Sequence, residues 1–116
     1  MTPAQLRRRC LALPGASESF PFGEGVSVFK VGGKLFALSR LDSDPFEVSL
    51  KCEPDLADQL RRAYPAVRPG YHLNKRHWNT VTLDGTIEDR LVADMIEDSY
   101  DLVVDGLPRS RRPAPG

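Results

Sequence analysis

The sequence VSVFKVGGKLFALS, residues 26–39, decides the fold of this chain. Two runs rich in β-branched, aromatic and other apolar side chains flank a central Gly-Gly pair. Two consecutive glycines accept the positive φ that a two-residue hairpin turn requires. The segment is therefore predicted to form an antiparallel β-hairpin, with Val31 opposite Lys34 and Phe29 opposite Phe36 on one face of the sheet.

Two further strands are predicted later in the chain. Residues 46–52 alternate between apolar and polar side chains, and residues 78–83 do the same, which is the pattern of a strand with one buried face. Because the apolar positions face the core, the alternation turns Lys51, Trp78 and Thr80 onto the opposite face. We expect these three side chains to lie on a sheet face that no helix covers.

Three helices are predicted around these strands. The first begins at Thr2, which can cap it, and the second begins at Pro54, since proline suits the first helical turn. The third follows the Asp-Gly turn at residues 84–85. The resulting order, α-β-β-β-α-β-α, favours an α+β fold in which helices pack on one face of a small antiparallel sheet.

Length and composition restrict the class of protein. The 116 residues suffice for one domain with its own core, here residues 1–107, and the Pro- and Arg-rich segment 108–116 is predicted to be disordered. Cys10 and Cys52 form no CxxC pair, no signal peptide precedes them, and no apolar run is long enough for a membrane span. We therefore expect a cytoplasmic protein with buried thiols and no membrane contact, and we expect a monomer.

Charge is segregated along the chain although it sums to zero. The 16 basic and 16 acidic residues balance, which argues against a protein that coats nucleic acid through its total charge. Residues 59–83 nevertheless contain no Asp or Glu, whereas residues 84–105 contain eight acids and one arginine. The cations of the acid-free stretch are Arg61, Arg62, Arg68, Lys75 and Arg76. Any site for a polyanion must therefore be local, and we expect it in this stretch.

Three segments of the chain carry a resemblance to a known family. They are LPGASESFPFGEGVSVFKVGGKLFALS (13–39), LKCEPDLADQLRRAYPAVRPGYHLNKRHWNTVTLDGTI (50–87) and SYDLVV (99–104). The most specific match is PGYHLNK followed by HWN, at residues 69–75 and 77–79. Together they resemble the MmcQ/YjbR family of small bacterial proteins. The resemblance implies a fold like that of the CyaY or frataxin group, with an antiparallel sheet and helices on one side, and a proposed role in DNA binding.

The candidate site is the basic aromatic loop before the last strand. Its cations can neutralise phosphates, and its aromatic rings offer flat faces to bases or grooves. This predicts weak binding of DNA with little base specificity. The residues predicted to bind nucleic acid are Arg68, Tyr71, His72, Lys75, Arg76, His77 and Trp78 in the loop and strand, with Lys34 and Lys51 extending the patch.

Two other interpretations of the same residues stay open. In the first, the cations are solvated and the aromatic rings only hold the loop down by packing, since exposed charge needs no function. In the second, Lys34, Lys75 and Trp78 surround a pocket for a small anion or a protein partner. The pocket interpretation differs from DNA binding in the shape of the surface around Trp78.

Metal and enzyme chemistry are not expected. The spacing of His72 and His77 fits neither a helical pair nor a zinc finger, so no metal or other cofactor is predicted. The basic first helix, with arginines at residues 7–9, removes the case for iron that the frataxin group suggests. Cys52 could act as a nucleophile, but it falls on the core side of its strand, where a buried small hydrophobe is the better interpretation. We therefore predict a protein without enzymatic activity.

Overall fold

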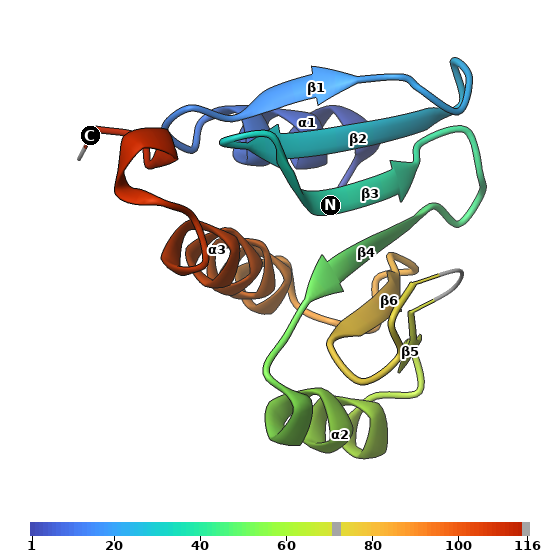
Figure 1. Ribbon diagram of the computed structural model, residues 1–116. Helices are drawn as coiled ribbons and strands as arrows, with labels where there is room; N and C mark the ends of the chain where they lie inside the picture. The colour runs from blue at the N-terminus through green and yellow to red at the C-terminus, as the bar shows by residue number, and fades with distance from the viewer. Residues whose placement is uncertain (71–72, 115–116) are drawn as a thin grey trace.

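The computed structural model describes residues 1–70 and 73–114. Its centre is a six-stranded antiparallel sheet in the order β1-β2-β3-β4-β6-β5 (Figure 1). The strands are β1 (Ser17–Ser19), β2 (Val26–Val31), β3 (Lys34–Arg40), β4 (Glu47–Lys51), β5 (Val67–Pro69) and β6 (Trp78–Thr82).

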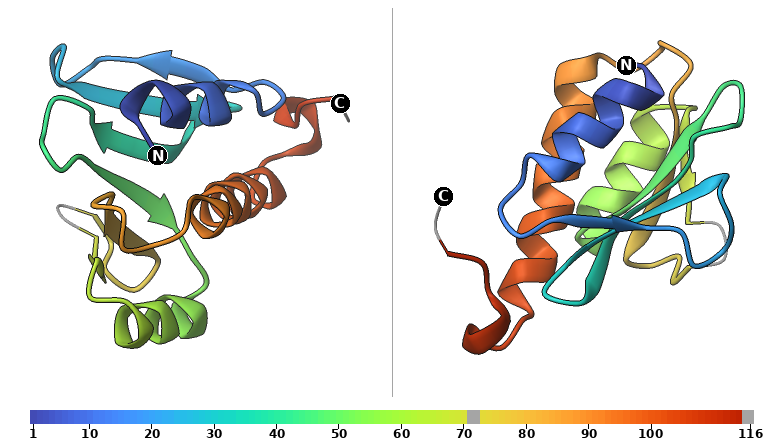
Figure 2. Two further views of the ribbon diagram at one scale, coloured as in Figure 1. Left: turned by 180° about the vertical axis from the view of Figure 1, so that it is seen from behind. Right: turned by 90° about the horizontal axis from the view of Figure 1, so that it is seen from above.

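Three helices, α1 (Pro3–Leu11), α2 (Pro54–Ala63) and α3 (Asp89–Asp105), lie side by side on one face of this sheet (Figure 2). The longest of them, α3, packs on β2, β3 and β4, while α2 packs on β5 and β6. The predicted α+β architecture with helices on one face is therefore confirmed. No helix within the described residues has both the length and the apolar character needed to cross a membrane.

The first helix begins where the sequence predicts it. Thr2 Oγ1 accepts a hydrogen bond from the Gln5 backbone N–H, and Gln5 Oε1 accepts one from the Thr2 backbone N–H over 2.8 Å. This reciprocal capping box satisfies two backbone donors that the first helical turn leaves free. The helix then buries Leu6 and Cys10 against the sheet.

The central hairpin has the predicted turn, but its register shifts along the strands. Val31 pairs with Lys34 as expected, whereas Phe29 pairs with Ala37 and not with Phe36. One extra residue in β3, Phe36, produces the shift. The two phenylalanine rings still contact each other, with their centroids 6.4 Å apart.

Ser99 of α3 satisfies the backbone at this bulge. Its hydroxyl donates to the Phe36 carbonyl over 2.6 Å and accepts from the Lys51 backbone N–H over 2.8 Å. The Phe36 carbonyl lies at the bulge, and the Lys51 N–H lies just beyond the last paired residue of β4 against β3. The Ser99 hydroxyl therefore supplies hydrogen bonds to two backbone groups that the strand pairing leaves free. The sequence pattern could not reveal the bulge, because its partner is 63 residues away along the chain.

Two short strands and a helical turn were not predicted. The strands β1 and β5 have only three residues each and form the two edges of the sheet. Three residues are too few for an alternating pattern to be recognised, and Pro69 at the end of β5 suits an edge because it has no N–H to donate. The segment expected to be disordered instead contains a 3-10 turn, η1 (Arg109–Arg111).

The core lies between the sheet and the helices. The strands contribute Phe29, Phe36, Val48, Leu50 and Val81, and the helices contribute Leu6, Cys10, Val92 and Ile96, all of them at most 2 % exposed. The opposite face of β4 and β6 is left without a helix, and the candidate site lies there.

Candidate nucleic-acid interface

The strands β4 and β6 place Lys51 beside Trp78. The register pairs these two residues, and it pairs Ser49 with Thr80 two positions further along. The intervening pair, Leu50 and Asn79, points to the helices. Because cross-strand partners share a face, Lys51, Trp78 and Thr80 lie on the face away from the helices, as predicted.

This face is ordered by a polar contact as well as by the strand ladder. Ser49 and Thr80 are buried, and their hydroxyl oxygens are 2.8 Å apart in a hydrogen bond. Trp78 and Lys51 at the same end of the strands are half-buried. Trp78 therefore belongs to a strand that is held by its pairing with β4 and by the bond between Ser49 and Thr80.

Arg61 of α2 anchors the loop that leads into β6. Its Nε donates to Asn79 Oδ1 over 2.7 Å, and its Nη2 donates to the backbone carbonyls of Lys75 and Trp78. Asn79 is itself buried and donates to the Ala57 carbonyl of α2. One guanidinium thus connects the helix, the loop and the strand.

Backbone contacts complete the anchoring. The Cys52 N–H donates to the His77 carbonyl and the Gly70 N–H to the Trp78 carbonyl, each over 2.8 Å. A Cβ on Gly70 would lie 2.8 Å from Trp78 Cβ, so only glycine permits this close approach. The loop therefore presents Lys75 and Arg76 from a backbone that is tied at both ends.

The structure separates four cations of the acid-free stretch into two groups, and the fifth, Arg62, is exposed on α2. Arg61 is used internally, with Asp58 as a further partner at 3.5 Å, and Arg68 forms an ion pair with Glu47 of β4. Lys75 and Arg76 are exposed and take part in no ion pair within the described part of the chain. Lys75 Nζ makes one long contact, 3.4 Å, with the Gly70 carbonyl. We call Lys51, Lys75, Arg76 and Trp78 the Trp78 face.

Lys34 is not part of the Trp78 face. It pairs with Val31, whose side chain is buried in the core, so Lys34 belongs to the helix side of the sheet at the exposed tip of the hairpin. The prediction that Lys34 extends the patch around Trp78 is wrong in this geometric sense. The positions of Tyr71 and His72, which were also predicted to contribute, lie outside the described residues. His77 is half-buried and contributes its backbone carbonyl to the anchoring of the loop.

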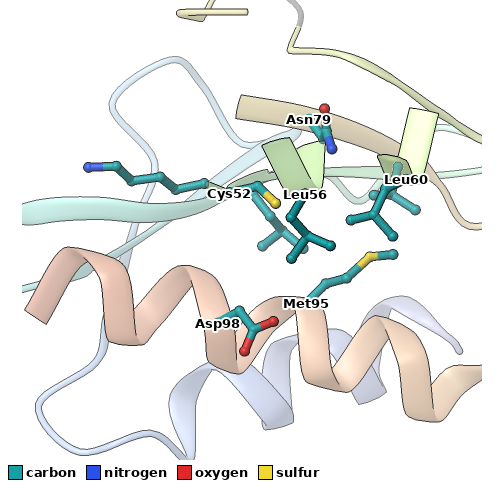
Figure 3. Close-up of a pocket in the computed structure, with 9 residues that line it drawn as sticks. Cys52, Leu56, Leu60, Asn79, Met95 and Asp98 are labelled. Atoms are coloured by element: carbon teal, nitrogen blue, oxygen red, sulfur yellow. The ribbon is translucent and has the colours of Figure 1, made fainter. Parts of the chain in front are cut away.

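The cavity nearest to this region is small and lies on the helix side. It has a volume of about 20 Å³, enough for about one water molecule. Figure 3 shows the side chains of Cys52, Leu56, Leu60 and Met95 around it, with Asn79 above and Asp98 at its rim. Neither Trp78 nor Lys34 lines it, nor do they line the two wider hollows described for residues 1–70 and 73–114.

The cysteines have the environment of buried hydrophobes. Burial raises the pKa of Cys10 to about 12, and burial together with the nearby Asp98 and Glu53 raises the pKa of Cys52. A thiol whose pKa is raised carries little thiolate at neutral pH, and the thiolate is the nucleophilic form. Among the described residues, no group of three His, Cys, Asp or Glu side chains is placed to hold a metal ion.

Arg61 is the residue that sequence reasoning missed. On the sequence alone it was treated only as one of five cations. In the structure it bonds to Asn79, which is 18 residues further along the chain, and to two backbone carbonyls of the loop and strand. The sequence does contain an indication of this contact. Asn79 is a polar residue at a core-facing position of its strand, and Arg61 is a long cation on the neighbouring helix. A buried amide needs hydrogen-bond partners, and the neighbouring helix is where such a partner must come from.

Comparisons with known proteins agree with this architecture. A crystal structure of the Deinococcus radiodurans protein DR2400, described as a DUF419 domain, superposes with a TM-score of 0.89 at 42% sequence identity, covering 95% of this chain and 84% of that one. A crystal structure of a protein from Pseudomonas syringae gives a TM-score of 0.76 at 28% identity, covering 88% and 98% of the two chains.

Sequence relatives point to the same family. The uncharacterised protein YbdF of Escherichia coli O157:H7 is 42% identical over 113 residues, which cover 95% of this chain and 92% of YbdF. The uncharacterised protein YjbR of Escherichia coli K12 is 39% identical over 112 residues, covering 97% and 95% of the two chains. The family model named YjbR matches residues 11–102. The chain therefore belongs to the YjbR family.

Proposed function

We propose that this protein binds DNA weakly and without base specificity through the Trp78 face. The observation that carries the proposal is an anchored loop with two exposed cations, Lys75 and Arg76, which form no ion pair with the described residues. This loop leads into a half-buried tryptophan on the sheet face that carries no helix among the described residues. Fixed cations can neutralise phosphates at a low entropic cost, and an indole offers a flat apolar surface to a base or a sugar.

The distribution of acidic groups supports the same orientation. A shallow hollow of about 250 Å³ between the start of α2 and α3 is lined by four carboxylates, from Glu53, Asp98, Asp101 and Asp105, together with Cys52, Leu56 and Leu102. These acids belong to the helix side, away from the Trp78 face. This hollow therefore repels a polyanion.

The small number of available cations limits the affinity. Arg61 and Arg68 already have partners within the protein, and Arg62 lies on α2, on the helix side of the sheet (Figure 2). Lys51, Lys75 and Arg76 therefore remain as candidates for phosphate contacts at the Trp78 face. Each contact contributes a log-log salt slope of about −0.9 for duplex DNA, so three contacts give a slope close to −3. We therefore propose contact with the DNA backbone.

A pocket for a small anion around Trp78 and Lys34 has less support. Such a pocket requires the two side chains to converge, and their strand registers put them on opposite faces of the sheet. We therefore propose that DNA binds to the surface around Trp78 and that no enclosed pocket takes part. The expectations of a non-enzymatic, monomeric, cytoplasmic protein with a CyaY-like sheet belong to the same proposal and stay predictions.

The test is the salt dependence of binding to a fluorescein-labelled duplex of mixed sequence, followed by anisotropy. The double variant Lys75→Gln with Arg76→Gln should reduce the steepness of the slope by about 1.8, since two contacts are lost. The matched control is Arg8→Gln with Arg9→Gln, which removes the same charge from exposed positions on α1 and should leave the slope unchanged. The absence of any complex with the wild-type protein at micromolar concentration and low salt would refute the proposal.

A further inference from the structure

The C-terminal segment after α3 is docked on the body of the protein. Leu107 is 4 % exposed, and the η1 turn follows it directly. The Arg112 side chain folds back along this turn, donating from Nε to the Leu107 carbonyl and from Nη2 to the Asp105 carbonyl, each over 3.1 Å. These contacts give the segment a defined position that its Pro- and Arg-rich composition does not suggest.

The docking place is the tip of the β2–β3 hairpin. A Cβ on Gly32 would lie 2.5 Å from Leu107 Cδ1 and 2.9 Å from the Arg111 carbonyl oxygen, so the segment packs directly on this glycine. On its other side, Pro113 approaches Gly15, where a Cβ would lie 3.1 Å from the proline ring. Figures 1 and 2 show the C-terminal turn beside the hairpin tip and the link between α1 and β1.

The docked segment gathers cations around the hairpin tip. Lys34 is two residues from Gly32, and Arg109, Arg111 and Arg112 surround the turn that packs on it. All four side chains are exposed, and none takes part in an ion pair within residues 1–70 and 73–114. We call Lys34, Arg109, Arg111 and Arg112 the tail patch.

Two other arginines in the described part of the chain are held in ion pairs with carboxylates on the strands. Arg7 forms a hydrogen-bonded ion pair with Glu18 of β1, and Arg68 forms one with Glu47. The carboxylate closest in sequence to the tail patch is that of Asp105, but Arg112 donates to the backbone carbonyl of that residue. The tail patch therefore brings together four cations that form no ion pair with the described carboxylates.

We propose that the tail patch is a second contact with the phosphate backbone of DNA, in the same complex that the Trp78 face forms. This inference rests on the proposed function and deepens it, because it adds a second group of phosphate contacts at a separate place on the protein. The packing of Leu107 and Arg111 on the hairpin fixes the backbone that carries the arginines, so less conformational entropy is lost on binding. It also gives Lys34 a role outside the Trp78 face, from which the register separates it by placing it on the opposite face of the sheet.

The experiment compares salt slopes for one labelled duplex across matched double variants of the full chain. Arg109→Gln with Arg111→Gln removes two charges and keeps Arg112, which anchors the turn. The expected result is a slope less steep by up to about 1.8 than that of the wild-type protein. The control, Arg8→Gln with Arg9→Gln, carries the same change of net charge and should keep the wild-type slope.

The outcomes separate the two proposals. An unchanged slope for Arg109→Gln with Arg111→Gln, together with a reduced slope for Lys75→Gln with Arg76→Gln, overturns the second contact alone. A reduced slope for the tail variant with an unchanged slope for the loop variant overturns the Trp78 face, and with it the shared complex. Absence of binding by the wild-type protein overturns both.

Discussion

Arg61 and Asn79 form the polar contact on which the candidate interface depends. The guanidinium of Arg61 donates to Asn79 Oδ1 over 2.7 Å, and the same guanidinium holds the carbonyls of Lys75 and Trp78. Asn79 is 3 % exposed, and Arg61 supplies a hydrogen bond to its side-chain oxygen. The charge of Arg61 therefore serves to hold the loop and the strand together within the protein, whether or not a ligand binds.

Replacement of Arg61 by alanine should lower the free energy of unfolding by about 2 kcal/mol. Hydrogen bonds that involve a charged group contribute about 1.5–3 kcal/mol, and the buried Asn79 oxygen would lose its donor. The measurement is urea denaturation of both proteins. The control is Arg62→Ala, at the next, exposed position of the same helix, where a change within about 0.5 kcal/mol is expected.

The same variant also tests positioning. Arg61 touches the loop backbone from the protein side, so Arg61→Ala should weaken DNA binding without changing the salt slope, whereas loss of Lys75 and Arg76 changes the slope itself. A stability equal to that of Arg62→Ala would show that the contact with Asn79 is not needed.

Gly32→Ala should destabilise the protein more than Gly33→Ala. Both glycines have positive φ, 57° and 81°, so alanine at either position adds backbone strain of about 1–2 kcal/mol. Only at Gly32 would the new Cβ also collide with Leu107 and the Arg111 carbonyl, whereas nothing lies within 4 Å of a Cβ on Gly33. Thermal or urea unfolding of the two variants isolates the packing of the C-terminal segment, and equal losses would mean that this packing contributes nothing.

Asp98→Asn should stabilise the protein at neutral pH and lose this effect in acid. Burial and the neighbouring Asp101 and Asp94 raise the pKa of Asp98 above its ordinary value of 3.8. A carboxyl with a raised folded-state pKa is charged at a greater cost in the folded state, so its contribution to stability falls as the pH rises through that pKa.

The neutral asparagine avoids this cost at pH 7, and below about pH 3.8 both proteins are uncharged at this position, so the difference disappears. The carboxyl is desolvated only in part and the residue as a whole is exposed, so solvent screens the effect and we expect a gain below about 1 kcal/mol. Urea denaturation across this pH range measures it, with Glu97→Gln on the same helix as the control. A gain that persists at low pH would rule out this electrostatic origin.

The fold was largely readable from local patterns. The Gly-Gly turn, the alternation in 46–52 and 78–83, and the cap at Thr2 each act over a few neighbouring residues, and the structure confirms all of them. The bulge at Phe36 and the edge strands β1 and β5 were not readable. The first is satisfied by the distant Ser99, and the strands are too short to show a period.

The candidate site was readable in part. Alternation placed Trp78 and Lys51 on one face because cross-strand neighbours share a face, and the register confirms that placement. Lys34 was assigned to the wrong neighbourhood, since charge alone does not tell which face a hairpin tip belongs to. Composition predicted a disordered tail from residue 108, and it could not indicate the approach of the Arg111 carbonyl to Gly32, which is a contact between distant parts of the chain.

The most direct test of DNA binding at the Trp78 face is the intrinsic fluorescence of Trp78, the only tryptophan of the chain. Addition of an unlabelled duplex at low salt should quench or shift its emission, because the half-buried indole lies beside Lys51 where the phosphates are expected. Added salt should restore the emission, and Lys75→Gln with Arg76→Gln should weaken the response. Formation of a complex, seen by anisotropy, with no change in Trp78 emission would contradict the proposed interface.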